Sequence, residues 1–285
     1  MCRFLCYRGP ALALETLLYE PTNSLILQSY KARERSEPLN GDGFGVGWYA
    51  PGVSPTPCVF TSVTPAWGNE NLRRLAGHIL SPCFFAHVRA ASPGMRVSEE
   101  NCHPFQYGPY LWMHNGAIGE FAKIKRRLRA SLDDAAYESI QGSTDSEHAF
   151  AVFLTLLGGC RPDSARALGV VLVETIRRLE RWSSEAGIRV PSFYNFAVTD
   201  GERLATVRYG SDPRLEPVSL YFAAGKRFVL GDGRCWLECG SPDERSVIVA
   251  SERLTQERRD WTRVAPNHVL TVSDDFEVSV DLVRV

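Results

Sequence analysis

The chain begins Met1-Cys2-Arg3-Phe4-Leu5-Cys6-Tyr7-Arg8, with a cysteine in second position followed directly by an apolar and aromatic run. The run over residues 3–7 is typical of a strand. If Met1 is removed, Cys2 carries both a thiol and the α-amine of the chain, whose reference pKa of about 7.7–8.0 makes it a usable base near neutral pH. One residue would then supply a nucleophile and a base. Position alone leaves a second interpretation open, an ordinary cysteine at an exposed terminus.

Strand patterns recur towards both ends of the chain, and helical periodicity is concentrated in the middle. Strands are predicted at residues 3–7, 44–49, 58–62, 84–90, 110–114, 193–199, 204–209, 220–223, 227–230, 247–250, 268–272 and 276–280. Helices are predicted at residues 11–18, 70–79, 121–132, 145–157 and 165–186. Thr144 and Glu147, at the start of the fourth helix, form a capping-box pattern. This grouping, in place of strict βαβ alternation, favours an α+β fold with antiparallel sheets and helices on their outer faces.

Length and composition restrict the class of protein. The chain has 285 residues, of which 44% are hydrophobic and 23% charged, which excludes a disordered chain and a disulfide miniprotein. Its 32 basic and 33 acidic residues nearly cancel, so no overall charge attracts nucleic acid or an anionic membrane. No repeat or low-complexity linker divides the sequence, and we therefore expect a single domain over residues 1–285.

Cysteine content and apolar patterning indicate the compartment. The eight cysteines are too few for a disulfide scaffold. The first residues lack the apolar segment of a secretory signal, and no apolar run is long enough to span a bilayer. We therefore expect a cytoplasmic protein with free thiols that does not associate with a membrane.

A first candidate binding residue is Arg89, in the predicted strand at 84–90. Alternation along this strand places Phe85, His87 and Arg89 on one face and the residues between them on the other. The forked donors of a guanidinium suit a ligand carboxylate, although an arginine at a strand end is also commonly solvated or salt-bridged.

Two further motifs allow both a structural and a functional interpretation. Asn115-Gly116 follows an apolar strand, as in a hairpin turn, but the Asn115 amide and the Gly116 N–H could also converge as an oxyanion hole. Asp145 falls in the first turn of a predicted helix, where it complements the helix dipole or could bind a ligand ammonium.

The sequence contains no complete motif for a metal or cofactor site. His87, Cys102, His103 and His114 invite a zinc hypothesis, but there is no HExxH or CxxC pair, and Cys235-x3-Cys239 lacks a second pair. The glycines at 41, 43, 45 and 47 do not have the spacing of a nucleotide-binding loop and indicate instead close approach of another segment to a strand. No GxSxG motif is present. We expect neither a metal nor a cofactor.

Taken together, these motifs resemble the class II glutamine amidotransferases. The resemblance is carried by Met-Cys-Arg-Phe-Leu at 1–5, Asn-Gly-Asp-Gly-Phe-Gly at 40–45, His-Val-Arg at 87–89, Asn-Cys-His-Pro-Phe at 101–105, His-Asn-Gly at 114–116 and Thr-Asp-Ser-Glu at 144–147, with further likeness at 247–252 and 266–268. The resemblance implies a four-layer αββα sandwich of two antiparallel sheets flanked by helices, the fold of N-terminal-nucleophile hydrolases. It implies no cofactor.

The resemblance also implies a role for each candidate residue. Cys2 would be the mature N-terminus and would attack a γ-glutamyl carbonyl to form a thioester. Asn115 and Gly116 would form the oxyanion hole. Arg89 would bind the α-carboxylate of the substrate and Asp145 its α-ammonium. Hydrolysis of the thioester would release glutamate.

The details are most similar to the stand-alone branch of the family, which includes the glutathione-degrading amidotransferase subunit and the ergothioneine-pathway γ-glutamyl amidohydrolase. Ala90 stands where the synthetase-linked members usually have an aromatic residue, and no acceptor-domain motif follows. We therefore expect a hydrolase of glutamine or a γ-glutamyl compound. Two alternatives remain, an ammonia-supplying glutaminase subunit of a complex with a separate synthetase and a catalytically silent glutamyl-binding module. The sequence does not specify the leaving group.

Overall fold

The computed structural model describes residues 2–34, 37–91, 94, 96–231, 234–239, 241 and 244–285. The chain forms two compact units, each assembled from two separate segments. The first unit contains Met1–Leu111 and Ser219–Val264, and the second contains Trp112–Val218 and Ala265–Val285. Because each unit draws on distant parts of the chain, we keep the single domain over residues 1–285 as a prediction.

The first unit is built on an antiparallel sheet in the order β10-β9-β11-β1-β4-β2-β3, with β12 also paired to β9. Its strands are β1 (Arg3–Ala13), β2 (Phe44–Trp48), β3 (Cys58–Ser62), β4 (Leu80–Val88), β9 (Tyr221–Gly231), β10 (Arg234–Cys239), β11 (Ser246–Ala250) and β12 (Thr262–Arg263). The strand β1 lies inside the sheet, with Leu5 opposite Ala250 of β11 and Ala86 of β4. The strand that follows Cys2 is therefore held on both sides.

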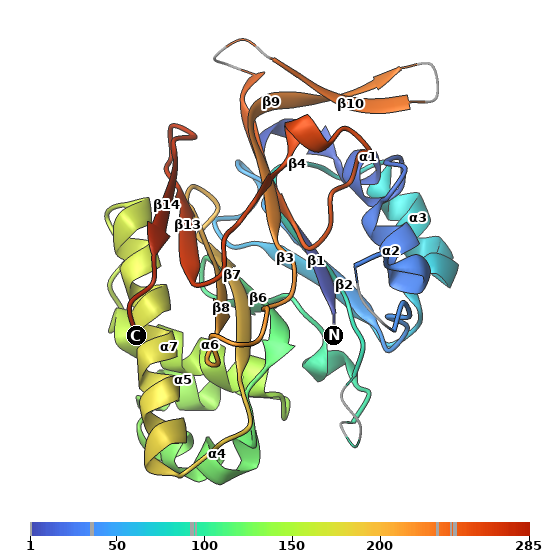
Figure 1. Cartoon of the computed structure of the whole chain (residues 1–285). Helices are drawn as coiled ribbons and strands as arrows, with labels where there is room; N and C mark the ends of the chain where they lie inside the picture. Colours follow the sequence, from blue (N-terminus) through green and yellow to red (C-terminus); the bar gives the residue numbers. More distant parts are fainter. Residues whose placement is uncertain are drawn as a thin grey trace. The chain divides into compact units, whose positions relative to one another are not determined.

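Three short helices cover one face of this sheet, as Figure 1 shows: α1 (Leu14–Leu18), α2 (Leu25–Lys31) and α3 (Glu70–Ala76). Phe84, Ala86 and Val88 point into the core beneath them. Phe85 and His87 are equally buried but lie outside that cluster, so the alternation predicted for this strand is confirmed. The remaining elements of the unit are β5 (Phe105–Tyr107) and the 3₁₀ turns η1 (Ala66–Gly68), η2 (Glu99–Asn101) and η4 (Arg258–Asp260).

The glycines of β2 confirm the close approach predicted for them. A Cβ at Gly45 would overlap the carbonyl oxygen of His103, and one at Gly47 would lie 2.8 Å from Pro104 Cγ. At Gly43, whose φ is +118°, a Cβ would lie 2.7 Å from Cys102 Sγ. The segment at 102–104 therefore packs directly on the backbone of β2, where any side chain would push it away.

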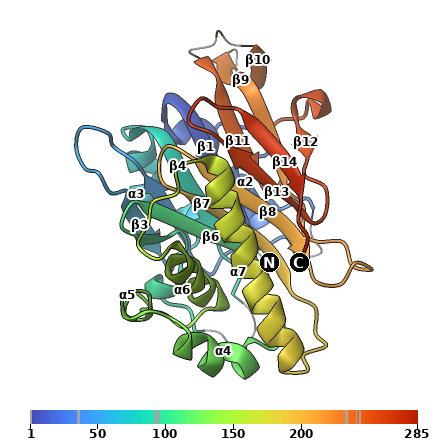
Figure 2. The ribbon, with the colours of Figure 1, turned by 90° about the vertical axis from the view of Figure 1, so that its left-hand side faces the viewer.

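The sheet of the second unit runs in the order β14-β13-β8-β7-β6-β5, of which β5 and the start of β6 belong to the first unit. Its other strands are β6 (Tyr110–Ala117), β7 (Phe193–Thr199), β8 (Leu204–Gly210), β13 (His268–Val272) and β14 (Val278–Leu282). The helices of the second unit are α4 (Phe121–Ala130), α5 (Asp134–Glu138), α6 (Asp145–Leu157) and α7 (Ala165–Glu185). The long helix α7 packs on β8 and β13, with α6 beside it (Figure 2). Trp112 is fully buried in this core, where it stacks on Phe150 at 5.4 Å.

The predicted α+β class is confirmed. Each unit provides one sheet and one set of helices, which are the components of the αββα arrangement. Within the described ranges, none of the helices combines the length and apolar character needed to cross a bilayer.

Several predicted boundaries are wrong. The helix predicted at 11–18 begins only at Leu14, because β1 stays paired with β4 as far as Ala13. The strands predicted at 220–223 and 227–230 are one strand, β9, interrupted by Gly225 at φ +71°. The pattern also missed α2, α5, β5, β10 and β12, all of which are short.

Candidate functional site

Cys2 lies immediately before β1, and its thiol is bound by the chain that leaves β4. The backbone N–H of Ala90 donates to Cys2 Sγ at 3.4 Å, and Sγ lies 3.6 Å from the carbonyl oxygen of Ala90. The register that places Arg3 opposite Val88 produces this approach. Cys2 is half-buried. Its thiol is therefore held at the residue that follows Arg89, one of the other predicted site residues.

Arg89 follows the last residue of β4 and is only 4% exposed, so the interpretation as a solvated strand-end side chain is wrong. Its backbone N–H donates to Gly43 O at 2.8 Å. Its guanidinium donates to the carbonyl oxygens of Asp42 at 3.3 Å and Arg96 at 3.2 Å. These bonds orient a buried cation beside the segment that binds the Cys2 thiol.

Asp42 is a site-supporting residue that the sequence did not single out. Its backbone N–H donates to Arg89 O at 3.0 Å, and its carboxylate accepts from the N–H of Ala91 at 2.8 Å. Asp42 thus fixes the backbone on both sides of Ala90. The signal was present in the Asn-Gly-Asp-Gly motif, but its glycines explain only the close packing and not the role of the carboxylate.

Asn115 and Gly116 lie inside β6, and the hairpin turn considered at this position is wrong. A Cβ at Gly116 would overlap the carbonyl oxygen of Phe193 in β7 and would lie 2.6 Å from His114 Nε2. Glycine is therefore needed for close strand approach and not for a turn. Asn115 is completely buried.

His114 joins β6 to two neighbouring elements. Its Nδ1 lies 2.8 Å from Ser146 Oγ in α6, and its Nε2 lies 3.0 Å from Phe193 O. Burial lowers the pKa of His114, against the opposing effects of Asp145 and the Phe193 carbonyl. A neutral ring carries its proton on Nε2, because the carbonyl can only accept. The Ser146 hydroxyl beside Nδ1 also donates to Asp145 Oδ1 at 3.2 Å, which links the ring to that carboxylate.

Asp145 is the first residue of α6 and binds the backbone just beyond β6. Its Oδ2 accepts from the N–H of Ile118 at 2.8 Å, and its Oδ1 accepts from the N–H of Ser146 at the same distance. The carboxylate is only partly buried. The second unit therefore brings Asn115, Gly116 and Asp145 to the same end of β6.

The capping box predicted at the start of α6 is half correct. Thr144 Oγ1 accepts from the N–H of Glu147 at 3.1 Å, as predicted. The Glu147 carboxylate, however, accepts from the N–H groups of Gln141 and Gly142, at 2.8 Å each. The Glu147 side chain thus binds the backbone of the preceding loop, whereas in a capping box it would bind the N–H of Thr144.

The residues behind the zinc hypothesis have other contacts. The rings of His87 and His103 lie 4.3 Å apart at an angle of 32°. In the part of the chain that the structure describes, no group of three or more His, Cys, Asp or Glu side chains could hold a metal. Burial raises the pKa of the Cys102 thiol to about 11, which keeps it protonated at neutral pH. The side chains of Cys235 and Cys239 lie outside the described residues.

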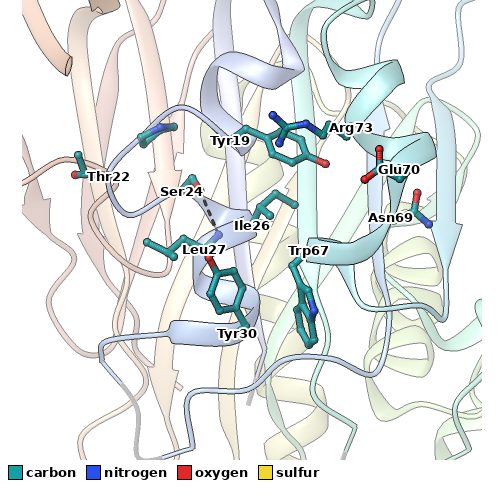
Figure 3. Close-up of a pocket in the computed structure, with 11 residues that line it drawn as sticks. Tyr19, Thr22, Ser24, Ile26, Leu27, Tyr30, Trp67, Asn69, Glu70 and Arg73 are labelled. Atoms are coloured by element: carbon teal, nitrogen blue, oxygen red, sulfur yellow. Dashed lines mark hydrogen bonds between the residues drawn. The ribbon is translucent and has the colours of Figure 1, made fainter. Parts of the chain in front are cut away.

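A cavity of about 710 Å³ opens among the helices of the first unit (Figure 3). Tyr30 and Trp67 meet edge to face at 5.8 Å on one side, and the Arg73 guanidinium covers the ring of Tyr19 at 5.3 Å on another. Burial raises the pKa of Tyr19 to about 12. None of the five predicted site residues lines this cavity, and its lining includes no cysteine.

The chain belongs to the class II glutamine amidotransferases, because the model of that family matches residues 19–281. It is 41% identical over 292 residues to the probable glutamine amidotransferase DUG3 of Saccharomyces cerevisiae, a match that covers 95% of this chain and 82% of the yeast protein. A shorter match, 34% identical over 119 residues, is to the gamma-glutamyl-hercynylcysteine sulfoxide hydrolase of Mycobacterium tuberculosis and covers 41% of this chain and 50% of that protein.

Solved structures agree with this assignment. A glutamine aminotransferase class-II domain protein from Silicibacter pomeroyi is similar over the full length of both chains, with a TM-score of 0.67 and 25% identity. The glutamine phosphoribosylpyrophosphate amidotransferase of Bacillus subtilis shares the fold over 99% of this chain and 49% of its own, with a TM-score of 0.59 and 15% identity. The predicted family, fold and enzyme class, an amidotransferase acting on a carbon–nitrogen amide bond, are therefore confirmed.

Proposed function

We propose that this enzyme hydrolyses the γ-glutamyl amide bond of glutamine or a γ-glutamyl compound, with Cys2 as the N-terminal nucleophile. One observation carries the proposal: Cys2 Sγ contacts both the N–H and the carbonyl of Ala90, directly beside the buried Arg89. The proposed nucleophile thus contacts the residue that follows the proposed carboxylate-binding cation, in a chain of this family. The hydrolase named for its gamma-glutamyl substrate among the relatives supports the substrate class.

The reaction requires removal of Met1, which lies outside the described residues. The α-amine of Cys2 then takes the thiol proton, directly or through water, and the sulfur attacks the γ-carbonyl carbon. The tetrahedral oxyanion collapses, the carbon–nitrogen bond breaks and the leaving amine takes the proton from the α-ammonium. Water then attacks the thioester, which releases glutamate and restores the thiol.

The remaining residues are assigned by their chemistry. Asn115 and the Gly116 N–H stabilise the oxyanion, whose charge develops only during the reaction. Arg89 binds the α-carboxylate of the substrate and Asp145 its α-ammonium. The position of Asp145 supports this assignment, because its partly buried carboxylate is fixed by backbone N–H groups.

The decisive experiment measures glutamate release from glutamine and from γ-glutamyl peptides by wild type and Cys2→Ala, on freshly reduced protein. Mass spectrometry must first show that the chain begins at Cys2. Release by the wild type alone supports the proposal, and equal rates refute it. Retained Met1 with no activity would favour a catalytically silent glutamyl-binding protein.

A partner subunit remains a separate prediction. If the protein supplies ammonia to a synthetase, its glutaminase activity should be low alone and should rise with formation of a glutamine-dependent product when the partner is added. Cytoplasmic localisation likewise remains a prediction, which fractionation of cells expressing the protein would test.

A further inference from the structure

A buried ion pair binds the first peptide group after the nucleophile. Arg3 Nη1 donates to the carbonyl oxygen of Cys2 at 2.9 Å, and Arg3 Nε donates to Glu252 Oε1 at 2.9 Å. The side chains of Arg3 and Glu252 are 0% and 1% exposed. Arg3 alternates with Phe4 along β1, so its side chain lies on the opposite side of the strand from the next residue.

The Glu252 carboxylate also forms hydrogen bonds with two other segments of the first unit. It accepts from the backbone N–H groups of Arg33 at 3.0 and 3.1 Å and of Glu34 at 3.0 Å, in the turn after α2. It accepts from Asn23 Nδ2 at 3.3 Å as well. Arg3 Nη2 donates to Glu34 O at 3.1 Å, which closes the network. One carboxylate thus ties the start of β1 to the turn after α2 and the loop after β11.

Stability alone explains this pair poorly. Removing two charges from water costs several kcal/mol per ion, and apolar replacements of such pairs are often no less stable. The position of the pair suggests another role. The first residue of a chain frays unless it is tied down, and Cys2 without Met1 is joined to the protein through a single peptide bond. That bond is the one whose carbonyl Arg3 binds.

We propose that Arg3 and Glu252 are positioning residues that hold the N-terminal cysteine in its attacking orientation. This inference rests on the proposed function. The pair acts through the peptide group of Cys2. Ser251 continues the attachment where the ladder of β1 and β11 ends, because its hydroxyl accepts from the N–H of Phe4 at 3.0 Å and its own N–H donates to Phe4 O at 3.0 Å.

The first test compares Arg3→Lys and Glu252→Gln with the wild type. A lysine ammonium keeps the charge but loses the fork that reaches Glu252 and the Cys2 carbonyl together. We expect kcat to fall by roughly ten- to hundredfold, the effect of a misplacement of about 1 Å, while KM changes less than threefold. KM should be retained because Arg89 and Asp145, the proposed glutamyl anchors, are unchanged.

Arg208→Lys is the matched control. Arg208 is equally buried and donates to Val218 O at 2.8 Å, Pro217 O at 2.6 Å and Glu216 Oε1 at 2.7 Å within the second unit. Its network is of the same kind, and these three partners all belong to the second unit. If Arg208→Lys loses as much kcat as Arg3→Lys for the same loss of thermal stability, Arg3 contributes only to folding. That result would overturn the proposal.

A double variant of the ion pair controls for loss of activity that is caused only by poor folding. Arg3→Met combined with Glu252→Met replaces both charges together and avoids an unpaired buried ion. The folded double variant should show the same loss of kcat as Arg3→Lys. Wild-type kcat in any of the folded variants would overturn the positioning role while leaving the proposed function intact. Glutamate release by Cys2→Ala at the wild-type rate would instead refute the proposed function.

Discussion

The carbonyl oxygen of Phe193 in β7 occupies the space that a side chain at position 116 in β6 would need. His114 of the same strand binds that oxygen through Nε2 at 3.0 Å. One carbonyl therefore fixes the spacing of two strands and requires glycine beside Asn115.

Gly116→Ala should destabilise the second unit because the methyl group must displace β7. Overpacking of this kind costs about 1–3 kcal/mol, which should lower the melting temperature by several degrees. Differential scanning fluorimetry provides the measurement. Gly68→Ala is the control, since a Cβ at Gly68 meets no atom within 4 Å. Equal melting temperatures for both variants would contradict the expected clash.

Asn115→Ala should lower kcat by roughly a hundredfold or more with little change in KM, the usual effect of losing one oxyanion donor. Steady-state glutamate release measures both constants. The control is Asn69→Ala, which removes the side chain that accepts from the N–H of Leu72 at 2.8 Å at the start of α3. That variant should lose about 1 kcal/mol of stability and keep its turnover. A change in KM alone would contradict the role of Asn115.

Asp145→Asn should reduce kcat/KM for glutamine by about tenfold or more, because it removes a charge that binds the α-ammonium. The asparagine oxygen can still accept from the N–H of Ile118, whereas the bond from the N–H of Ser146 is lost, so the fold should be retained with a small loss of stability. Glutaramate, which lacks the α-ammonium, should be cleaved equally by wild type and variant. An equal loss for both substrates would indicate that Asp145 only supports the end of β6.

Arg89→Lys should likewise weaken glutamine binding, because a single ammonium cannot bind a carboxylate through two parallel bonds. The matching substrate is 4-aminobutanamide, which keeps the amine and lacks the α-carboxylate. Wild type and variant should cleave it at similar, low efficiency. If the variant loses as much with this substrate as with glutamine, the guanidinium serves only to hold the loop at Asp42 and Arg96.

Acid should destabilise the second unit through His148. Burial lowers its pKa to about 4, and its Nδ1 lies 2.7 Å from Thr144 O. In the unfolded state His148 has an ordinary histidine pKa near 6.5, so between about pH 4 and 6.5 the unfolded state binds a proton that the folded state does not bind. The free energy of unfolding should therefore fall as the pH drops from about 6.5 to about 4.

His148→Asn keeps a donor near Thr144 O and removes the titration. Urea unfolding between pH 4 and 7 should therefore show a shallower pH dependence for this variant. His78→Asn, at an exposed position, should keep the wild-type slope. Identical slopes for His148→Asn and wild type would show that the histidine does not control acid stability.

The sequence predicted best what depends on local pattern. The bounds of α6 follow from the Thr144 cap and the apolar repeat behind it, and the faces of β4 follow from simple alternation. The environment of Asn115-Gly116 could not be predicted, because Phe193 lies 77 positions away and local statistics for Asn-Gly favour a turn. Glu252 was missed for the same reason, since its partner Arg3 is 249 positions distant.

The interleaving of the two units has a consequence for synthesis. The strand β1, which follows Cys2, pairs with β11, and that strand is translated last among the neighbours of β1. At usual elongation rates, about 10–50 s separate the emergence of Cys2 from that of residues 246–250. Throughout this interval β1 can pair with β4 but not with β11. A methionine aminopeptidase can therefore act on the start of the chain before the sheet around β1 is complete.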